Sequence, residues 1–432
     1  MHNRAQSSRW RQVCTSLLTL VAGSASAAFF LLSGNANAED FSSSGQIRSL
    51  WEHASVNGNG PAAAANALQN GIIQTVSNTE MLEAEYHLSG NGMTAIATLH
   101  AQTPAGGSAN LSGWLNELYQ DANLADWQLS AGKKIVSWDV GFGFRPNDMV
   151  QQEQRRALIS NTLIGRPLVM AEWFGADQAL SVVWVNPGRH IDATNADSIQ
   201  EQALAMRTYW RNGSLDWYGF ARYGEQNGGS LGTAAAWVAT DSTELHGSLR
   251  YLSRSANLTA SRSGVLATSS PWQVSEKSDV LQALAGFTYT TADQHSWLIE
   301  YWYDGNAPDK AAWQNWNQRN VQLTRFASQH PALQAPAAAN LAWQNNGFSV
   351  PNNLRQKNLY LRWSQQAATW QPAIDLLWTP EDHGYVSTWS MGWQGDRWHI
   401  DAGLRFYGGP ATAIYAQLPT RRTAYLMTTW SF

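Results

Sequence analysis

Apolar and polar residues alternate over short stretches along most of the chain, which is the pattern of β-strands with one apolar face. The segment 396–407 shows it most clearly. Its apolar face carries Trp398, Ile400, Ala402, Leu404 and Phe406. Its polar face carries Arg397, His399, Asp401, Gly403 and Arg405. The same alternation recurs in 78–90, 281–290, 295–303 and 359–365, so it is a property of the whole chain and not of one segment.

Extending this reading predicts about 18 strands. They fall near 44–56, 78–90, 93–103, 113–121, 126–138, 168–176, 178–186, 202–211, 214–223, 231–240, 243–253, 280–291, 295–303, 355–365, 369–378, 384–394, 396–407 and 422–432. Each has roughly 9 to 12 residues, the length that crosses a bilayer when a strand is tilted by about 45°. No stretch after the first 38 residues is apolar for long enough to form a transmembrane helix.

The predicted connections alternate between short and long. Short ones contain turn residues, such as Asn91-Gly92 and Asn212-Gly213, whereas the intervening ones include 57–77, 139–167, 254–279 and 304–354. This sorting is typical of a transmembrane barrel with tight periplasmic turns and long extracellular loops. We therefore predict an all-β, antiparallel up-and-down barrel of about 18 strands (16–18), closed because lipid cannot satisfy an open sheet edge.

The final strand, Thr423–Phe432, alternates and ends the chain on an aromatic residue. It resembles the closing strand of bacterial outer-membrane β-barrels. The resemblance implies that Trp430 and Phe432 belong to the signal read by the outer-membrane insertion machinery.

Residues 1–38 have the features of a secretory signal peptide. Arg4, Arg9 and Arg11 precede an apolar, small-residue stretch, and Ala36-Asn37-Ala38 is a cleavage motif. We expect the barrel to occupy 39–432. Cleavage would remove Cys14, the only cysteine, and leave 25 basic against 32 acidic residues, a net charge of −7. A nucleic-acid binder would be expected to be basic.

The composition agrees with a membrane barrel. Charged residues make up 14% of the chain, against roughly 25% in soluble proteins, and there are 23 tryptophans. A large secreted β-protein, such as a carbohydrate-binding sandwich or propeller, would have a similar composition but no reason to sort its loops by length.

A more specific pattern lies between 115 and 138. Leu115-Asn116-Glu117-Leu118-Tyr119 leads to a turn, then to Gly132-Lys133-Lys134 and Trp138. It resembles the pattern of porin-like barrels related to the alginate exporters, although Lys134 stands where glutamine is usual. The resemblance implies a wide barrel in which the following loop, 139–167, folds into the pore.

If the apolar faces meet lipid, the charged side chains line the lumen. The pore-lining candidates are Glu83, Glu85, Glu172, Arg207, Arg222, Arg250, Glu300, Arg362, Arg397, Asp401 and Arg405. The constriction-loop candidates are Arg145, Asp148, Glu153, Arg155 and Arg156. Such charges set the ion preference of a pore, or they form salt-bridge ladders that hold the wall together.

Other chemistry has little support in the sequence. Ser390, His399 and Asp401 are close along the chain, but His399 and Asp401 share one strand face and do not form a catalytic arrangement, so no enzyme is predicted. The histidines have no metal-ligand spacing, and no cofactor is expected. Within 310–328, Trp313, Trp316 and Leu323 recur at helical spacing, which predicts a helix in a loop, with sugar stacking at the pore mouth as one reading.

The sequence thus predicts a porin-like channel in the outer membrane of a Gram-negative cell, passing small polar or anionic solutes. Two alternatives are an exporter of a polysaccharide or other secreted product, and a secreted carbohydrate-binding β-protein without a pore. The expected partners are the lipid bilayer, lipopolysaccharide, the insertion machinery and a small solute or polysaccharide, with no nucleic acid.

Overall fold

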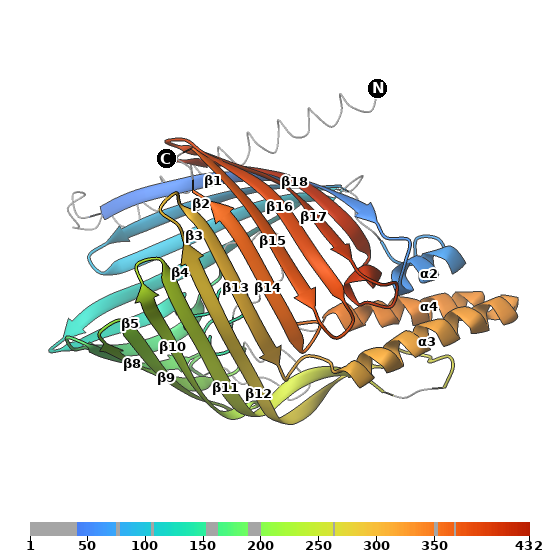
Figure 1. Ribbon diagram of the computed structural model, residues 1–432, viewed down its shortest axis with the longest axis horizontal. Helices are drawn as coiled ribbons and strands as arrows, with labels where there is room; N and C mark the ends of the chain where they lie inside the picture. The colour runs from blue at the N-terminus through green and yellow to red at the C-terminus, as the bar shows by residue number, and fades with distance from the viewer. Residues whose placement is uncertain are drawn as a thin grey trace.

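The computed structural model describes residues 41–74, 78–104, 108–152, 163–188, 200–261, 264–349, 353–366 and 369–432. Eighteen antiparallel strands form one closed barrel in which each strand pairs with its neighbours in the chain (Figure 1). The ring closes where β1 pairs with β18, from Gln46 opposite Ser431 to Val56 opposite Thr420. The predicted fold class is confirmed, and the predicted signal peptide, 1–38, lies outside the described residues.

The strands follow one another around the ring. They are β1 (Phe41–Val56), β2 (Asn78–Gly90), β3 (Met93–Pro104), β4 (Asn110–Leu124), β5 (Trp127–Lys134), β6 (Arg166–Phe174), β7 (Gln178–Val185), β8 (Ala203–Asn212), β9 (Leu215–Gly224), β10 (Gly228–Thr240), β11 (Thr243–Ala260), β12 (Trp272–Thr290), β13 (His295–Asp304), β14 (Lys357–Gln365), β15 (Trp370–Thr379), β16 (Gly384–Gln394), β17 (Trp398–Gly408) and β18 (Thr420–Ser431).

The two ends of the barrel differ. At one end, which we call the turn end, consecutive strands join through tight turns, and both β1 and β18 have their terminal ends there. The turn between β2 and β3 uses Asn91 and Gly92 with φ of 51° and 78°, the left-handed conformations that a two-residue hairpin needs. The opposite end, the loop end, carries the longer connections.

Three predicted boundaries differ from the structure. The segment predicted as a loop, 254–279, is mostly strand, because 254–260 pairs with 272–278 and lengthens the β11–β12 hairpin. The connection between β9 and β10, predicted as a longer loop over 224–230, covers only 225–227, because β10 already begins at Gly228. The strand predicted over 126–138 ends at Lys134, since Glu117 accepts the Ile135 N–H at 2.6 Å and the chain then leaves the wall.

Helices gather beyond the loop end (Figure 1). They are α2 (Pro61–Leu68), α3 (Lys310–Gln329) and α4 (Gln334–Gln344), with the short turns η3 (Pro331–Leu333), η4 (Asn345–Ser349) and η5 (Tyr415–Gln417). The predicted helix over 310–328 is thereby present as α3, whose first turn is capped by the Asp309 carboxylate. Ala65 of α2, Leu323 of α3 and Leu341 of α4 form a small apolar core between the helices.

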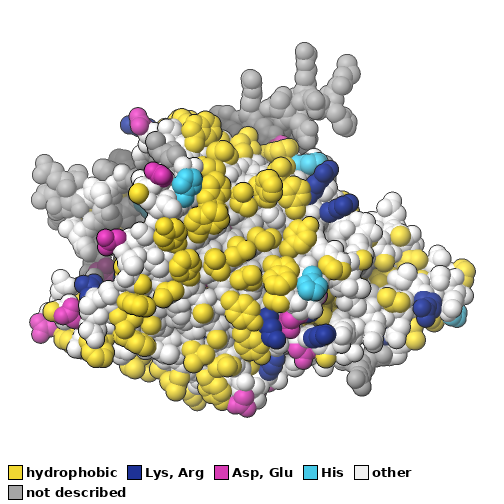
Figure 2. Space-filling model, in the orientation of Figure 1, with side chains coloured by type: hydrophobic (Ala, Val, Ile, Leu, Met, Phe, Trp, Pro, Cys, Tyr) yellow, Lys and Arg dark blue, Asp and Glu magenta, His cyan; other side chains and the backbone are white. Residues whose placement is uncertain are grey.

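The outside of the barrel is apolar. Figure 2 shows hydrophobic side chains spread across the wall facing the viewer, with charged side chains mainly at its borders. Exposed tryptophans ring the turn end, one or a few residues from the turns; they are Trp127, Trp210, Trp217, Trp237, Trp297, Trp370 and Trp398. This is the aromatic girdle expected where a barrel wall meets a membrane–water interface. Among the described helices, none is both long and apolar enough to span a membrane.

Candidate functional site: the inner face of the barrel

The inner face is built by the polar members of the alternating strands. On β17 the outward Leu404 is 49% exposed, whereas Asp401 lies opposite Met427 and Gly403 opposite Tyr425 on β18. Met427 and Tyr425 pack against Leu50 inside the barrel. The inner face of this wall therefore combines charged residues with a few apolar ones.

The chain after β5 turns into the barrel. This segment, 135–152, is the inner loop. Its apolar residues Trp138, Met149 and Val150 are buried against the inward side chains of β6–β10, including Val183 and Phe220. An inner loop of this kind was implied by the alginate-exporter-like pattern at 115–138, although that family is not shown for this chain. Because the loop is packed on one side of the wall, it narrows the lumen there.

Glu300 of β13 holds the tip of the inner loop. Its side chain is completely buried. Its two carboxylate oxygens accept the backbone N–H groups of Phe142 and Gly143, each at 2.6 Å, and His246 lies 3.0 Å from one of them. Charge-assisted bonds to a buried carboxylate are strong, so Glu300 fixes where the tip lies. The Phe142 ring then stacks on Tyr360, with the Arg362 guanidinium 5.5 Å from its centroid.

A second set of contacts holds the following residues. Asn147, fully buried, donates to the Ser248 hydroxyl at 2.7 Å, and Arg250 donates to the Pro146 carbonyl at 2.8 Å. The Ser248 hydroxyl donates in turn to Asp139 at 2.8 Å. Burial raises the pKa of the Asp139 carboxyl, against the lowering effect of the Asn147 N–H, the Ser248 hydroxyl and other donors. The inner loop is thus anchored to β11 as well as to β13.

Because Gly232 of β10 has no side chain, it leaves space for the Asn147 side chain of the inner loop. A Cβ added there would lie 1.8 Å from the Asn147 Oδ1, whereas a Cβ at Gly229 of the same strand would meet nothing within 4 Å. We expect Gly232→Ala to displace Asn147 and lower the free energy of unfolding by about 1–3 kcal/mol. Gly229→Ala is the matched control, for which urea-dependent unfolding in detergent should show little change. Equal stability of the two variants would contradict the packing of Asn147 against Gly232.

The acidic candidates of β2 lie on the inner face beside cationic and histidine partners. Glu83 is 3.1 Å from Arg48 and 3.3 Å from His100. Glu85 is 2.6 Å from His87 and accepts Gln46 at 2.8 Å. Their carboxylates are therefore bound into the wall by these partners.

The arginine candidates differ in whether they form ion pairs with carboxylates. Arg222 lies 2.6 Å from the buried Glu201, Arg207 lies 3.8 Å from Glu172, and Arg362 lies 2.9 Å from Asp375. Arg250 is buried beneath the inner loop. Arg405 of β17, by contrast, donates to the Thr388 hydroxyl at 2.8 Å and has no carboxylate within salt-bridge distance among the described residues.

Some predicted residues lie elsewhere. Arg397, which the sequence placed on the inner face of a strand, is exposed in the turn before β17, because that strand begins only at Trp398. Of the constriction-loop candidates, Arg145 and Asp148 lie in the inner loop. Arg145 bonds to Ser137 at 2.7 Å, and Asp148 accepts the Trp138 N–H. Glu153, Arg155 and Arg156 lie outside the described residues.

Sequence reasoning missed the uncharged members of the site. Asn147, Ser248 and Tyr360 carry no charge, and their alternation is the same as that of any strand or loop residue. His246 was not singled out either. The one available signal was that His246, Ser248 and Arg250 share one face of β11, which makes this strand unusually polar on its inner side.

The first turns of α3 pack against one side of the rim at the loop end. Trp313 and Trp316 of α3 are 3% and 5% exposed and pack with Trp272, Ile414 and Tyr415. Their indole N–H groups donate to the Leu354 and Gln344 carbonyls. The reading of these tryptophans as a sugar-stacking surface is therefore wrong, because their rings are enclosed by the fold.

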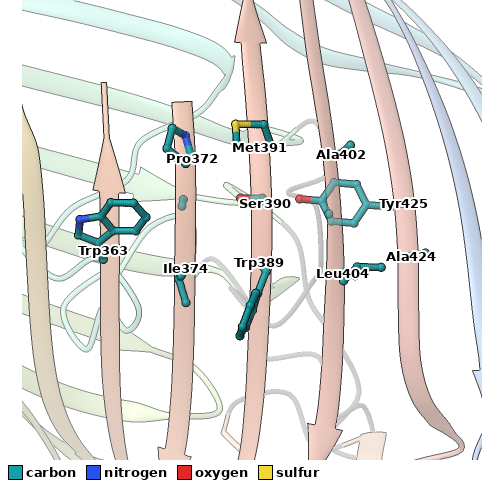
Figure 3. A pocket seen from close by; sticks show the side chains of 12 residues that line it. Trp363, Pro372, Ile374, Trp389, Ser390, Met391, Ala402, Leu404, Ala424 and Tyr425 are labelled. Carbon is teal, nitrogen blue, oxygen red and sulfur yellow. The ribbon is translucent and has the colours of Figure 1, made fainter. Parts of the chain in front are cut away.

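A shallow groove of about 530 Å³ lies on the outside of the wall formed by β14–β18 (Figure 3). Exposed Trp389 and Leu404 flank the small Ala402 and Ala424. From the inner side, the Tyr425 ring covers Gly403, and its hydroxyl reaches Asp401 and Ser390. The groove thus belongs to the outer, apolar surface and not to the lumen.

In the part of the inner face that the structure describes, the side chains form no arrangement for metal or nucleophilic chemistry. Within the described ranges, no group of three or more His, Cys, Asp or Glu side chains is placed to hold a metal ion. The His399 Nδ1 lies 2.9 Å from the Gln394 side-chain oxygen, and no described bond joins it to Ser390 or Asp401.

Comparisons with known proteins bear on the fold. No family model matches the sequence, and no curated protein matches it. Solved structures do match. OccK3 (OpdO) of Pseudomonas aeruginosa has a TM-score of 0.50 at 9% identity, covering 91% of this chain and 96% of that one. OccK11 (OpdR) of the same organism gives 0.48 at 8%, covering 91% and 96%. A mutant porin of Rhodopseudomonas blastica gives 0.42 at 9%, covering 91% and 100%. At this identity the OccK3 likeness shows the barrel fold alone.

Proposed function

We propose that this protein is an outer-membrane channel that passes small polar or anionic solutes through its lumen. The observation that carries the proposal is the division of the wall into an apolar outer face, bordered at the turn end by tryptophans, and an inner face formed by the polar members of the alternating strands. The outer face is suited to contact with lipid and the inner face to contact with water. A soluble β-sandwich would bury its apolar faces between two sheets, whereas here the apolar residues of a closed ring point outward.

The inner loop makes the channel a narrow one. It projects from β5 across the inward faces of β6–β11 and reaches β13. The open part of the lumen is therefore bounded by the inner loop on one side and by β14–β18 and β1–β3 on the other. We propose that charged side chains bordering this space, among them Arg405 of β17 and the partly exposed Arg362 of β14, orient charged and dipolar solutes.

Liposome swelling with sugars of graded size tests the channel. A porin-like protein is expected to admit small sugars and to exclude larger ones, whereas a dedicated polysaccharide exporter, closed until engaged, would show no swelling. A protein that stayed soluble and compact without detergent would instead support the secreted carbohydrate-binding alternative.

Arg405 provides a direct test of the role of the lumen charge. Because its guanidinium has no described carboxylate partner, we expect Arg405→Gln to lower the preference for anions over cations, seen as a shift in reversal potential under a salt gradient. The control is Arg422→Gln. Arg422 of β18 lies opposite the outward Phe406 of β17, so its side chain is on the outer face and not in the lumen. A reversal potential that moved equally in both variants would contradict an inward role for Arg405.

A further inference from the structure

A continuous row of aromatic rings runs up the inside of the barrel from the turn end. Tyr209 of β8 and Tyr218 of β9 have ring centroids 5.2 Å apart. Tyr218 stacks on Phe220 at 6.2 Å with an interplanar angle of 14°, and Phe220 meets Trp138 of the inner loop at 6.2 Å. We call these four residues the aromatic column. The outward neighbours Trp210 and Trp217 are exposed, so the column lies on the opposite, inner side.

The two ends of the column differ in accessibility. Phe220 and Trp138 are buried beneath the inner loop and account for its packing. Tyr209 and Tyr218 are only partly buried and lie closer to the turn end. The inward residues of the flanking strands are small: Ala179 of β7 lies opposite Tyr209, and Ala234 of β10 lies opposite Tyr218. The flanking strands therefore place small side chains next to the two tyrosines, and Tyr218 also packs against the core beneath the inner loop.

Charged groups of both signs border the two rings. The Tyr209 hydroxyl donates to Asp216 at 2.7 Å and accepts Arg211 at 3.1 Å. On the other side, Arg207 lies 5.6 Å from the Trp138 ring and 3.8 Å from Glu172. The Tyr218 hydroxyl has no hydrogen-bond partner among the described residues. The site thus offers both donors and acceptors.

Acidic groups outnumber basic ones around the two rings, because Glu244 lies near Tyr218 and Asp177 near Arg211, in addition to Glu172 and Asp216. Such a set disfavours an anionic solute, whereas a neutral solute with many hydroxyl groups matches its donors and acceptors. The C–H groups on the flat face of a sugar ring can stack on the partly exposed tyrosine rings. Specific ligand sites commonly combine aromatic surfaces with a few placed polar groups of this kind.

We propose that Tyr209 and Tyr218, with Glu172, Arg207 and Asp216, form a binding site for the ring of a neutral sugar on the turn-end side of the inner loop. This deepens the proposed channel function and rests on it, because the site is reached through the lumen. A sugar held here lies directly before the narrowed part of the channel. The site would therefore favour sugars over other neutral solutes of equal size.

Isothermal titration calorimetry of the detergent-solubilised barrel with maltotriose tests the site without requiring conduction. We expect saturable binding in the unaltered protein, weakened roughly five- to tenfold by Tyr218→Ala, since removal of one aromatic face costs on the order of 1 kcal/mol. Tyr218→Phe, which keeps the ring, should retain most of the affinity. Tyr289→Ala is the control, because Tyr289 is exposed on the outer face. Tyr218→Leu replaces the alanine variant if that variant does not fold.

The outcomes separate this site from the channel itself. Channels that conduct ions without any maltotriose binding, or binding that Tyr218→Ala and Tyr218→Leu leave intact, would overturn the sugar site and leave the channel standing. Saturable binding that is lost with Tyr218 would support the site, even if planar-bilayer recordings showed no conduction and so rejected the proposed channel.

Discussion

Replacing Glu300 by alanine is expected to release the tip of the inner loop and raise single-channel conductance. The variant leaves three donors without their acceptor: the backbone N–H groups of Phe142 and Gly143, and His246. Breaking a buried, charge-assisted set of this kind costs about 3–5 kcal/mol, which exceeds what the stacking of Phe142 on Tyr360 supplies. The tip would then be free to move away from β13 and widen the lumen.

Planar-bilayer recordings measure the effect directly. The unaltered channel should give one narrow distribution of conductance steps, and Glu300→Ala a larger and broader one. Glu244→Gln is the matched control, because Glu244 of β11 is 45% exposed and lies 3.7 Å from the same His246. If Glu300→Ala left the conductance unchanged while the protein stayed folded, the inner loop would not set the width of the channel.

Replacing Arg222 by alanine is expected to be the most destabilising single change at the rim of the loop end. Its guanidinium lies 2.6 Å from Glu201, whose side chain is fully buried and also accepts the N–H groups of Gln226 and Asn227. Loss of the arginine leaves a buried carboxylate without a counter-charge, which costs about 3–5 kcal/mol. The connection before β8 would loosen from the β9–β10 turn.

Urea-dependent unfolding in detergent measures this loss. The comparison is Arg211→Ala, because Arg211 and Asp216 form an ion pair that is largely exposed, and exposed pairs contribute little. Comparable destabilisation in the two variants would contradict the role assigned to burial.

Glu201 also makes the rim sensitive to acid. Burial alone would raise the pKa of its carboxyl, but the Arg222 charge and the hydrogen bonds from Asn227 and Gln226 outweigh burial and lower the pKa below 4.5. A carboxyl whose pKa is lower in the folded state stabilises the fold above its unfolded-state pKa. This contribution is present above about pH 4.5 and disappears as the pH falls through the lowered value.

The fold was predictable because membrane barrels are specified by local patterns. Alternation of period two located a strand at each of the eighteen positions, and turn residues such as Asn91-Gly92 separated them. The predicted strand ends were wrong where strands continue past the part of the wall that has a lipid-facing and a water-facing side. Beyond Leu252, β11 continues as a hairpin held by pairing with 272–278, although polar residues there have no membrane face to mark them.

The site was only partly predictable. Charged residues on the inner faces, such as Glu300 and Arg222, were evident from alternation, but their partners come from other parts of the chain. Glu300 binds backbone N–H groups 157 and 158 residues away, which no local pattern encodes. The tryptophans of α3 were misread for the same reason, since only the folded loops show that they are enclosed.

Thiol labelling along β17 tests most directly whether one face of the wall meets lipid and the other meets water. Cys14 is the only cysteine, so single cysteines can be placed one at a time from His399 to Phe406 in a Cys14→Ser background reconstituted into liposomes, leaving out position 403, which the Tyr425 ring covers. A small, charged, water-soluble maleimide is expected to label positions 399, 401 and 405, and to leave 400, 402, 404 and 406 unlabelled. Labelling of all seven positions alike, or of the even-numbered set alone, would contradict a channel with a wet interior.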